Sequence, residues 1–228
     1  MKLRAVLFDA AETLFTTRGS VGELYGALAR EYGSTADNTE IQAAFIREFQ
    51  HSGPLTTRGE KQWWHDVVHR VFTEVGMVEN FDRFFDQVYD QFRDSRGWLL
   101  FPETREVLME LKSRGFKLGV ISNFDSRVYT VMQSLGIHEF FDTVSISSEI
   151  GYAKPHPGIF LAAIEALGVP AARILVVGDS LMDDVQAGQL SGMNAVLVDR
   201  HNKYPEMKAF KRITNLREVL SFVELTPA

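Results

Sequence analysis

The sequence predicts an α/β fold, in which a Rossmann-like parallel sheet carries helices on both faces and an all-helical segment is inserted near its start. Two observations predict it. After Pro102, short apolar runs alternate with amphipathic stretches that end at glycine, which is the βαβ pattern of a parallel sheet. Before that point, an opening apolar run is followed by four amphipathic stretches with no strand signal between them. We therefore expect a core made of residues 1–16 and 99–228 and a helical unit made of residues 17–98.

The opening run, Arg4–Phe8, is apolar, and Asp9 with a polar turn follows it at once, as is typical of a buried strand that ends in a loop. The first of the four helices should begin at a capping box formed by Ser20 and Glu23. The expected apolar faces are Leu24, Leu28 and Tyr32 in the first helix, Ile41, Phe45 and Phe49 in a second that begins near Thr39, Trp64, Val67, Val68, Val71 and Phe72 within Glu60–Val75, and Phe81, Phe84, Phe85, Val88 and Phe92 in the fourth.

The rest of the chain predicts strands and helices in strict alternation. Strands joined by helices in this way lie parallel, with connections of one hand. We expect helices over Glu103–Arg114, Ser126–Leu135, Gly158–Leu167 and Asp183–Leu190, strands over Lys117–Ser122, Thr143–Ser147, Arg173–Val177 and Ala195–Asp199, and a closing helix over Asn215–Val223.

The composition excludes several classes of protein. The chain has 228 residues, of which 45% are apolar and 24% charged, as in a globular protein with a sizeable core. A net charge of -6 gives no general attraction to a polyanion, so we expect no nucleic-acid partner. The absence of cysteine excludes disulfides, thiolate metal sites and a cysteine nucleophile. The apolar run within the first ten residues is too short for the hydrophobic part of a secretion signal, and it ends at Asp9. No later stretch approaches ~20 apolar residues. We therefore expect a soluble, cytoplasmic protein without a membrane partner.

Polar side chains follow the expected strands at the points where ligands bind to parallel sheets. Asp9, the pair Ser122 and Asn123, and Asp179 each come at the end of a strand, and Lys154 lies in a loop. Taken singly, each is an ordinary turn or capping residue. Taken together, they bring carboxylates, hydroxyl and backbone donors, and a cation to one edge of the sheet.

This combination suits phosphoryl transfer. Mg²⁺ prefers oxygen ligands and is held by one or two carboxylates together with substrate phosphate, a role that Asp9 and Asp179 could fill. The Lys154 ammonium and backbone N–H groups near Ser122 would stabilise charge on phosphate oxygens. We therefore expect a Mg²⁺ cofactor and a small phosphate ester as substrate.

Four motifs, in this order, resemble those of the haloacid dehalogenase-like hydrolases: Val6–Leu14, Val120–Asn123, Lys154–Pro155, and Val177–Ser180 with Asp183 and Asp184. The resemblance spans nearly the whole chain. It implies that Asp9 attacks phosphorus and becomes an aspartyl phosphate, that Ser122 and Lys154 bind phosphate, and that carboxylates of the fourth motif hold Mg²⁺. It also implies that the helical insertion is a C1-type cap. Gln62–Val68 and Ile121–Asp125 are similar to the subgroup called haloacid dehalogenase-like hydrolase domain-containing protein three.

One position departs from the pattern of the family's phosphatases, which carry an aspartate as general acid and base two residues after the nucleophile. Here that residue is Ala11, and a positioned general acid is worth about 10²–10⁴ in rate. Glu12 is a candidate substitute. The expected site residues are Asp9, Glu12 and Lys154 in catalysis, Ser122, Asn123 and Lys154 on the substrate, and Asp9, the Ala11 carbonyl, Asp179 and Asp184 at the metal, Asp184 being favoured over Asp183 by its spacing from Asp179.

Three other interpretations stay open. A dehalogenase of the same family would use Asp9 on carbon without a metal, and a binding protein would hold a phosphate ligand without turnover. His65 and His69, one helical turn apart, resemble part of a zinc motif, although histidines on the polar face of a helix are commonplace. Candidates for contacting the leaving group are Arg18, Arg58 and Trp63.

Overall fold

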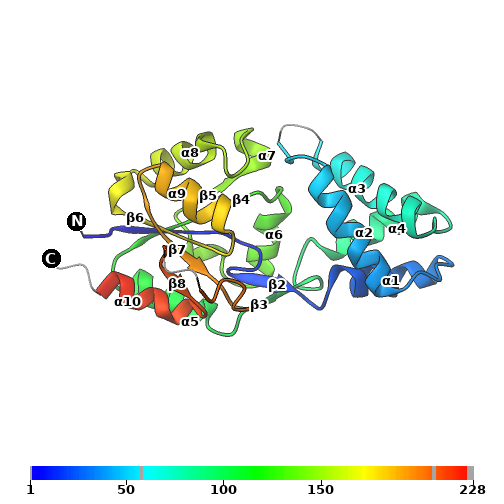
Figure 1. Cartoon of the computed structure of the whole chain (residues 1–228), viewed down its shortest axis with the longest axis horizontal. Helices are drawn as coiled ribbons and strands as arrows, with labels where there is room; N and C mark the ends of the chain where they lie inside the picture. The colour runs from blue at the N-terminus through cyan, green and yellow to red at the C-terminus, as the bar shows by residue number, and fades with distance from the viewer. Residues whose placement is uncertain (1, 57–58, 207–208, 225–228) are drawn as a thin grey trace.

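A six-stranded sheet forms the centre of the computed structural model in Figure 1, which describes residues 2–56, 59–206 and 209–224. Every pair of neighbouring strands is parallel, which confirms the predicted fold class. The order across the sheet is β5 (Thr143–Ile146), β4 (Lys117–Ser122), β1 (Ala5–Phe8), β6 (Ile174–Gly178), β7 (Asn194–Val198) and β8 (Arg212–Ile213).

Helices cover both faces of this sheet, as the alternation of side chains along β1 shows. Val6 and Phe8 belong to one buried cluster, and Ala5 and Leu7 belong to another. In Figure 1, α8 and α9 lie on one side of the sheet, and α5 and α10 lie on the other. The helices of this part are α5 (Thr104–Ser113), α6 (Arg127–Ser134), α7 (Ser147–Ile150), α8 (Pro157–Leu167), α9 (Ala187–Leu190) and α10 (Val219–Glu224), with a π-helical turn at Leu181–Gln186 and short 3-10 turns at His138–Phe140, Ala171–Arg173 and Leu216–Glu218.

A separate two-stranded antiparallel sheet, which the sequence pattern did not predict, pairs β2 (Phe15–Thr17) with β3 (Trp98–Leu100). Strands of three residues are too short to show a period in the sequence. The rings of Phe15 and Trp98 meet edge to face across this pair, 5.2 Å apart. Between the two strands the chain forms four helices that lie away from the large sheet: α1 (Val21–Glu31), α2 (Asn38–His51), α3 (Glu60–Val75) and α4 (Phe81–Gln91).

Two expectations about these helices were wrong in detail. Helix α2 begins at Asn38, because Asp37 caps it and forms a capping box with Glu40. Ile41 is buried as expected, but Phe49, expected inside, is 43% exposed, because the buried face of α2 runs through Ile41 and Ala44.

No helix within the described ranges is both long and apolar enough to cross a bilayer.

Phe15 should contribute strongly to stability, because its ring is fully buried at the start of β2. We expect Phe15→Ala to lower the free energy of unfolding by about 3–5 kcal/mol in urea titrations followed by tryptophan fluorescence. Leu99→Ala, in the paired strand, is the matched control, since Leu99 is 46% exposed. Equal losses in the two variants would show that the burial of the Phe15 ring is not what determines its contribution to stability.

Candidate active site

The polar residues that the sequence singled out meet at the carboxyl ends of three adjacent strands. Asp9 follows β1, Ser122 ends β4, and Asp179 follows β6. The backbone N–H of Asp9 donates to Val177 O at 2.9 Å, which fixes the start of the Asp9 loop against β6. Because β1 lies between β4 and β6, the carboxylate of Asp9 lies at the centre of the site.

Lys154 connects these strand ends. Its ammonium group donates to Asp9 Oδ1 and to Asp184 Oδ1, both at 2.6 Å, from a side chain that is 4% exposed. Ser122 Oγ donates to the same oxygen of Asp9 at 3.4 Å. Asn123 holds the backbone of Lys154 on both sides: its Nδ2 donates to Lys154 O at 2.9 Å, and its Oδ1 accepts from Lys154 N at 2.7 Å. Asn123 therefore positions the lysine.

Three carboxylates gather beside this lysine. Asp9, Asp179 and Asp184 each offer an oxygen, and these oxygens lie within 4.8 Å of one another. Asp184, and not Asp183, completes the cluster. The close approach of Asp184 to the end of β6 requires glycine at position 178, because a Cβ there would lie 2.2 Å from Asp184 Cγ.

The cluster carries more negative charge than Lys154 can balance. Burial, with repulsion from Asp9 and Asp184, raises the pKa of Asp179 to about 7. Burial also raises the pKa of Asp184 to about 6, although Lys154 opposes the shift. Burial by itself would lower the pKa of Lys154, but the neighbouring Asp184 and Asp9 outweigh it and raise that pKa. Carboxylates that repel one another and offer only oxygen atoms as ligands fit a hard divalent cation such as Mg²⁺.

His65 and His69 on α3 do not belong to a comparable cluster of potential metal ligands among the described residues. Across the described part of the chain, no other group of three His, Asp or Glu side chains comes together this closely. His65 Nε2 lies 3.0 Å from Asp82 Oδ1, and its ring is stacked beside that of His69. The geometry gives no support to a zinc site.

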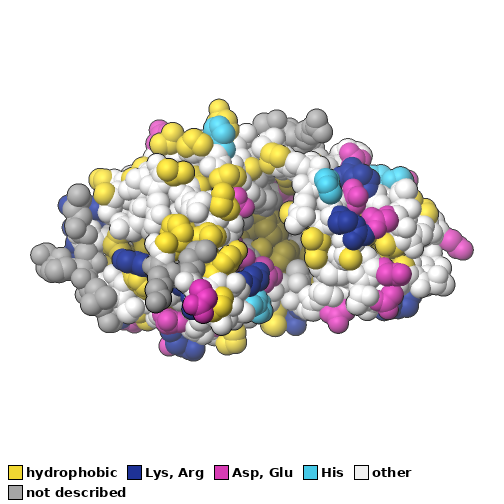
Figure 2. Space-filling view, in the orientation of Figure 1, with side chains coloured by type: hydrophobic (Ala, Val, Ile, Leu, Met, Phe, Trp, Pro, Cys, Tyr) yellow, Lys and Arg dark blue, Asp and Glu magenta, His cyan; other side chains and the backbone are white. Residues whose placement is uncertain are grey.

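A cavity of about 340 Å³ opens above the carboxylates. Figure 2 shows it as a hollow between the two parts of the molecule, with hydrophobic side chains visible inside. Its polar floor includes all the predicted substrate and metal residues: Asp9, Ala11, Ser122, Asn123, Lys154, Asp179 and Asp184, with Ser180 and Asp183.

Glu12 lies apart from this cavity. Its carboxylate accepts a hydrogen bond from Thr16 Oγ1 at 2.7 Å, and the residue lines a second, smaller hollow with Asp179, Asp199 and Arg200, so that Asp179 borders both hollows. Ala11 does line the main cavity, but its side chain is only a methyl group and offers no acid. Among the candidates for contacting the leaving group, neither Arg18 nor Trp63 lines the cavity, and Arg58 falls outside the described residues.

A buried ion pair that the sequence did not indicate supports one wall. Arg127 donates to both oxygens of Asp125, with a shortest distance of 2.6 Å, and the two side chains are 9% and 0% exposed. Trp64 Nε1 of α3 donates to the same carboxylate. The guanidinium group lies over the Tyr89 ring, 4.0 Å from its centre. The position of Asp125 in a turn does not indicate its hydrogen bond to Trp64, because Trp64 lies 61 residues away in the chain.

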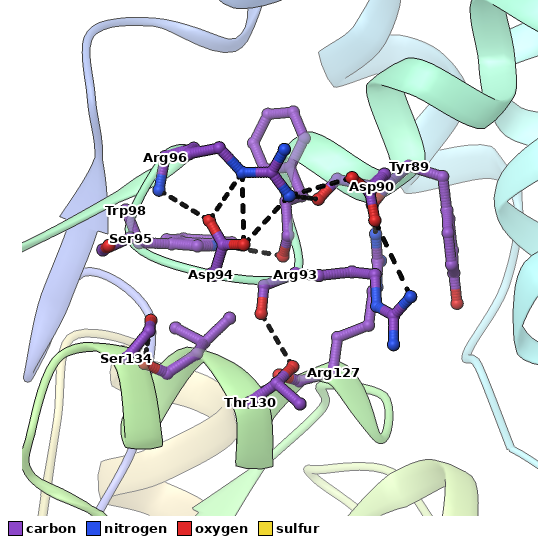
Figure 3. Close-up of polar contacts among 12 residues, drawn as sticks. Tyr89, Asp90, Arg93, Asp94, Ser95, Arg96, Trp98, Arg127, Thr130 and Ser134 are labelled. Carbon is purple, nitrogen blue, oxygen red and sulfur yellow. Dashed lines mark hydrogen bonds and ion pairs between the residues drawn. The ribbon is translucent and has the colours of Figure 1, made fainter.

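Further contacts join α6 to the end of α4. In Figure 3, Arg127 and Thr130 of α6 lie beside Tyr89 and Arg93. Arg127 Nη1 donates to Tyr89 O at 3.4 Å, and Thr130 Oγ1 donates to Arg93 O at 2.7 Å. The wall of the cavity is thus anchored to a helix that packs on the sheet.

Comparisons with known proteins agree with the motifs. A family model described as haloacid dehalogenase-like hydrolase matches residues 3–192. The chain is 33% identical over 207 residues to haloacid dehalogenase-like hydrolase domain-containing protein 3 of Mus musculus, covering 87% of this chain and 82% of that protein. This relative confirms the subgroup similarity that the sequence indicated.

Two further comparisons carry different names. The glyceraldehyde 3-phosphate phosphatase of Methanothermobacter thermautotrophicus is 31% identical over 216 residues, covering 86% of each chain. A solved L-2-haloacid dehalogenase has a TM-score of 0.78 at 22% identity, covering 98% of this chain and 100% of that one. At that identity the likeness demonstrates a shared fold.

Removing the negative charge of Asp179 should stabilise the folded protein, and the gain should depend on pH. Burial and the neighbouring carboxylates raise the pKa of folded Asp179 to about 7, well above its ordinary value of 3.8, so the folded state binds more protons between these values and loses stability as the pH rises. In buffer without Mg²⁺, Asp179→Asn should raise the free energy of unfolding by roughly 1–3 kcal/mol at pH 8, and by much less at pH 4.5. Thermal melts at the two pH values measure this.

Asp183→Asn is the matched control, because Asp183 lies outside the carboxylate cluster. A gain that is the same at both pH values for Asp179→Asn would contradict the charge argument.

Proposed function

Since the chain belongs to the haloacid dehalogenase-like hydrolase family, we propose that it is a Mg²⁺-dependent hydrolase of small phosphomonoesters, with Asp9 as the nucleophile. One observation carries the proposal: three carboxylates, of which Asp9 and Asp184 are buried and Asp179 is partly buried, share the floor of a cavity with a lysine. An anionic phosphate can bind there only if a cation offsets the carboxylate charge. The phosphatase name of the relative in Methanothermobacter thermautotrophicus supports the same class of substrate.

The residues divide the work as follows. Asp9, Asp179, Asp184 and the Ala11 carbonyl would hold Mg²⁺, which when bound neutralises charge on the phosphate and on the carboxylates. Lys154 and Ser122 hold Asp9 Oδ1, which leaves Oδ2 to attack phosphorus. The new O–P bond forms as the bond to the leaving oxygen breaks, and Asp9 becomes an aspartyl phosphate. Water then attacks this phosphorus, releases phosphate and restores the carboxylate.

Proton transfer to the leaving group is the weak step. Ala11 offers no acid inside the cavity, and Glu12 is hydrogen-bonded to Thr16 outside it. The leaving oxygen then departs unprotonated, so esters of acidic alcohols should react fastest. Glu12 can serve as the acid only if its loop turns toward Asp9.

We also propose that residues 17–98 act as the cap and residues 1–16 and 99–228 as the catalytic core. Helices α1 to α3 and the residue following α4 contribute side chains to the cavity, while the strand ends contribute its floor. This arrangement places the carboxylates at the bottom of a hollow between cap and core, where their low exposure to water strengthens the electrostatic interactions with phosphate.

A metal-free dehalogenase is the alternative, since Asp9 could also displace halide from carbon. The carboxylate cluster weighs against it, because a reaction without metal gains nothing from Asp179 and Asp184. Chloride release from 2-chloropropionate in EDTA would support the alternative.

Asp9→Asn should abolish turnover, because an amide keeps the shape of the side chain but is a poor nucleophile. We expect phosphate release from a panel of phosphomonoesters with Mg²⁺ to fall by about 10³ or more, while the melting temperature shows that the fold is retained. An unchanged rate would refute the mechanism, and full wild-type activity in EDTA would refute the role of Mg²⁺.

Restoring the missing carboxylate should correct the weak step. Ala11→Asp should accelerate hydrolysis of alkyl phosphates by part of the about 10²–10⁴ that a general acid supplies, with less effect on aryl phosphates. Glu12→Gln is the paired variant: it should change little if Glu12 stays outside the cavity, and it should be severely slowed if Glu12 is the acid. If neither substitution changes the rate on any substrate, both accounts of proton transfer are wrong.

A further inference from the structure

The wall of the cavity above the phosphate site is formed mainly by aromatic rings. They come from α1, α2, α3, the end of α4, β3 and the loop after β4. We call this set the aromatic wall: Tyr25, Phe45, Phe49, Trp64, Phe92, Trp98 and Phe124.

The rings of the aromatic wall hold one another in place. Tyr25 meets Phe45 and Phe92 edge to face at 5.7 Å, and Trp98 lies 5.4 Å from Phe124. Trp64 is fixed by its hydrogen bond to Asp125. A surface held in this way loses little freedom when a ligand packs on it.

The same wall offers almost nothing to a polar ligand. Among the described residues that line the cavity, the cations are Lys154, which is paired with Asp9 and Asp184, and Arg127, which is paired with Asp125. Thr17 Oγ1 already donates to Gly19 O at 2.6 Å. The hydroxyls of a polyol, or a second anionic group, would lose water there without gaining a partner, at a cost of about 1–3 kcal/mol for each group.

One polar atom of the aromatic wall stays available. Both indole N–H groups are used, by Asp125 and by Phe92 O. The hydroxyl of Tyr25, a residue that is 4% exposed, has no hydrogen bond to any of the described residues. The aromatic wall therefore offers a polar ligand at most one hydroxyl, that of Tyr25.

From these observations we propose that the substrate is an aryl phosphomonoester, whose flat aromatic leaving group packs on the aromatic wall while its phosphate lies beside Asp9 and Lys154. This inference rests on the proposed function and narrows its substrate class. A cavity of about 340 Å³ is at the small end for ligand sites, so it suits one or two fused rings. Ala11 points the same way independently, because an aryloxide leaves without needing a proton from the enzyme.

Binding of phosphonates tests the ring preference without turnover. Benzylphosphonate copies phenyl phosphate with a carbon in place of the ester oxygen, and methylphosphonate lacks the ring. With Mg²⁺ present, calorimetry should give a dissociation constant at least about 10-fold lower for benzylphosphonate. 3,4-Dihydroxybutylphosphonate, a polyol analogue, should bind no better than methylphosphonate. Equal affinities for the benzyl and methyl compounds would overturn the inference.

Phe49 allows a matched pair of variants. It lines the cavity and is 43% exposed, whereas Ile46, on the same helix, is 45% exposed and does not line it. Phe49→Ser should reduce the benzyl advantage by about 3-fold or more, and Ile46→Ser should leave it unchanged. A full benzyl advantage in Phe49→Ser, or an equal loss in both variants, would place the ring elsewhere and overturn the inference.

Kinetics separate this inference from the proposed function. An aryl phosphate and a fluoroalkyl phosphate are chosen so that their leaving alcohols have the same acidity, with acetyl phosphate as a small reference substrate. A kcat/KM about 10-fold or more in favour of the aryl ester supports recognition of the ring. Equal values overturn the inference and leave the phosphatase function standing. No turnover of any of the three refutes the proposed function, and the aryl phosphate as substrate with it.

Discussion

Lys154 donates to Asp9 and to Asp184 at 2.6 Å each, and the geometry of the active site depends on this pair of bonds. Asp9 follows β1 and Asp184 belongs to the turn after β6, so one ammonium group ties two strand ends together. Asn123, after β4, fixes the lysine backbone and adds a third. Without this cation, three carboxylates within 4.8 Å of one another would lack any compensating charge. Lys154 partly balances the charge of the three carboxylates, and the negative charge that remains would be offset by a divalent cation.

Two kinds of element build the two ends of the cavity. The loops after parallel strands supply charged and hydrogen-bonding groups, because the carboxyl ends of those strands meet at one edge. The helices between β2 and β3 supply rings. In the proposed function, the residues that bind phosphate are therefore separate in sequence from those that face the rest of the substrate.

Sequence patterns predicted the parts of the molecule that depend on local order. Strand β4 was predicted with its bounds, and the convergence of Asp9, Ser122 and Asp179 follows from where strands end. The aromatic wall was not predicted, because the exposure of Phe49 depends on which face of α2 packs inward. The partnership of Trp64 with Asp125 spans 61 residues, and no local pattern records it.

The loop from Ser122 to Arg127 reaches both ends of the cavity. Ser122 contacts Asp9 on the floor of the cavity. A few residues later, Asp125 accepts a hydrogen bond from Trp64 of α3, and the backbone N–H of Ser126 donates to Glu60 of the same helix. The four-helix insertion is therefore not an interchangeable module. If it were exchanged for that of a relative, Asp125 and Ser126 would face unfamiliar side chains, and the loop that carries Ser122 would shift with them. A substitution of Trp64 or Glu60 on α3 therefore also removes a contact that holds the loop carrying Ser122.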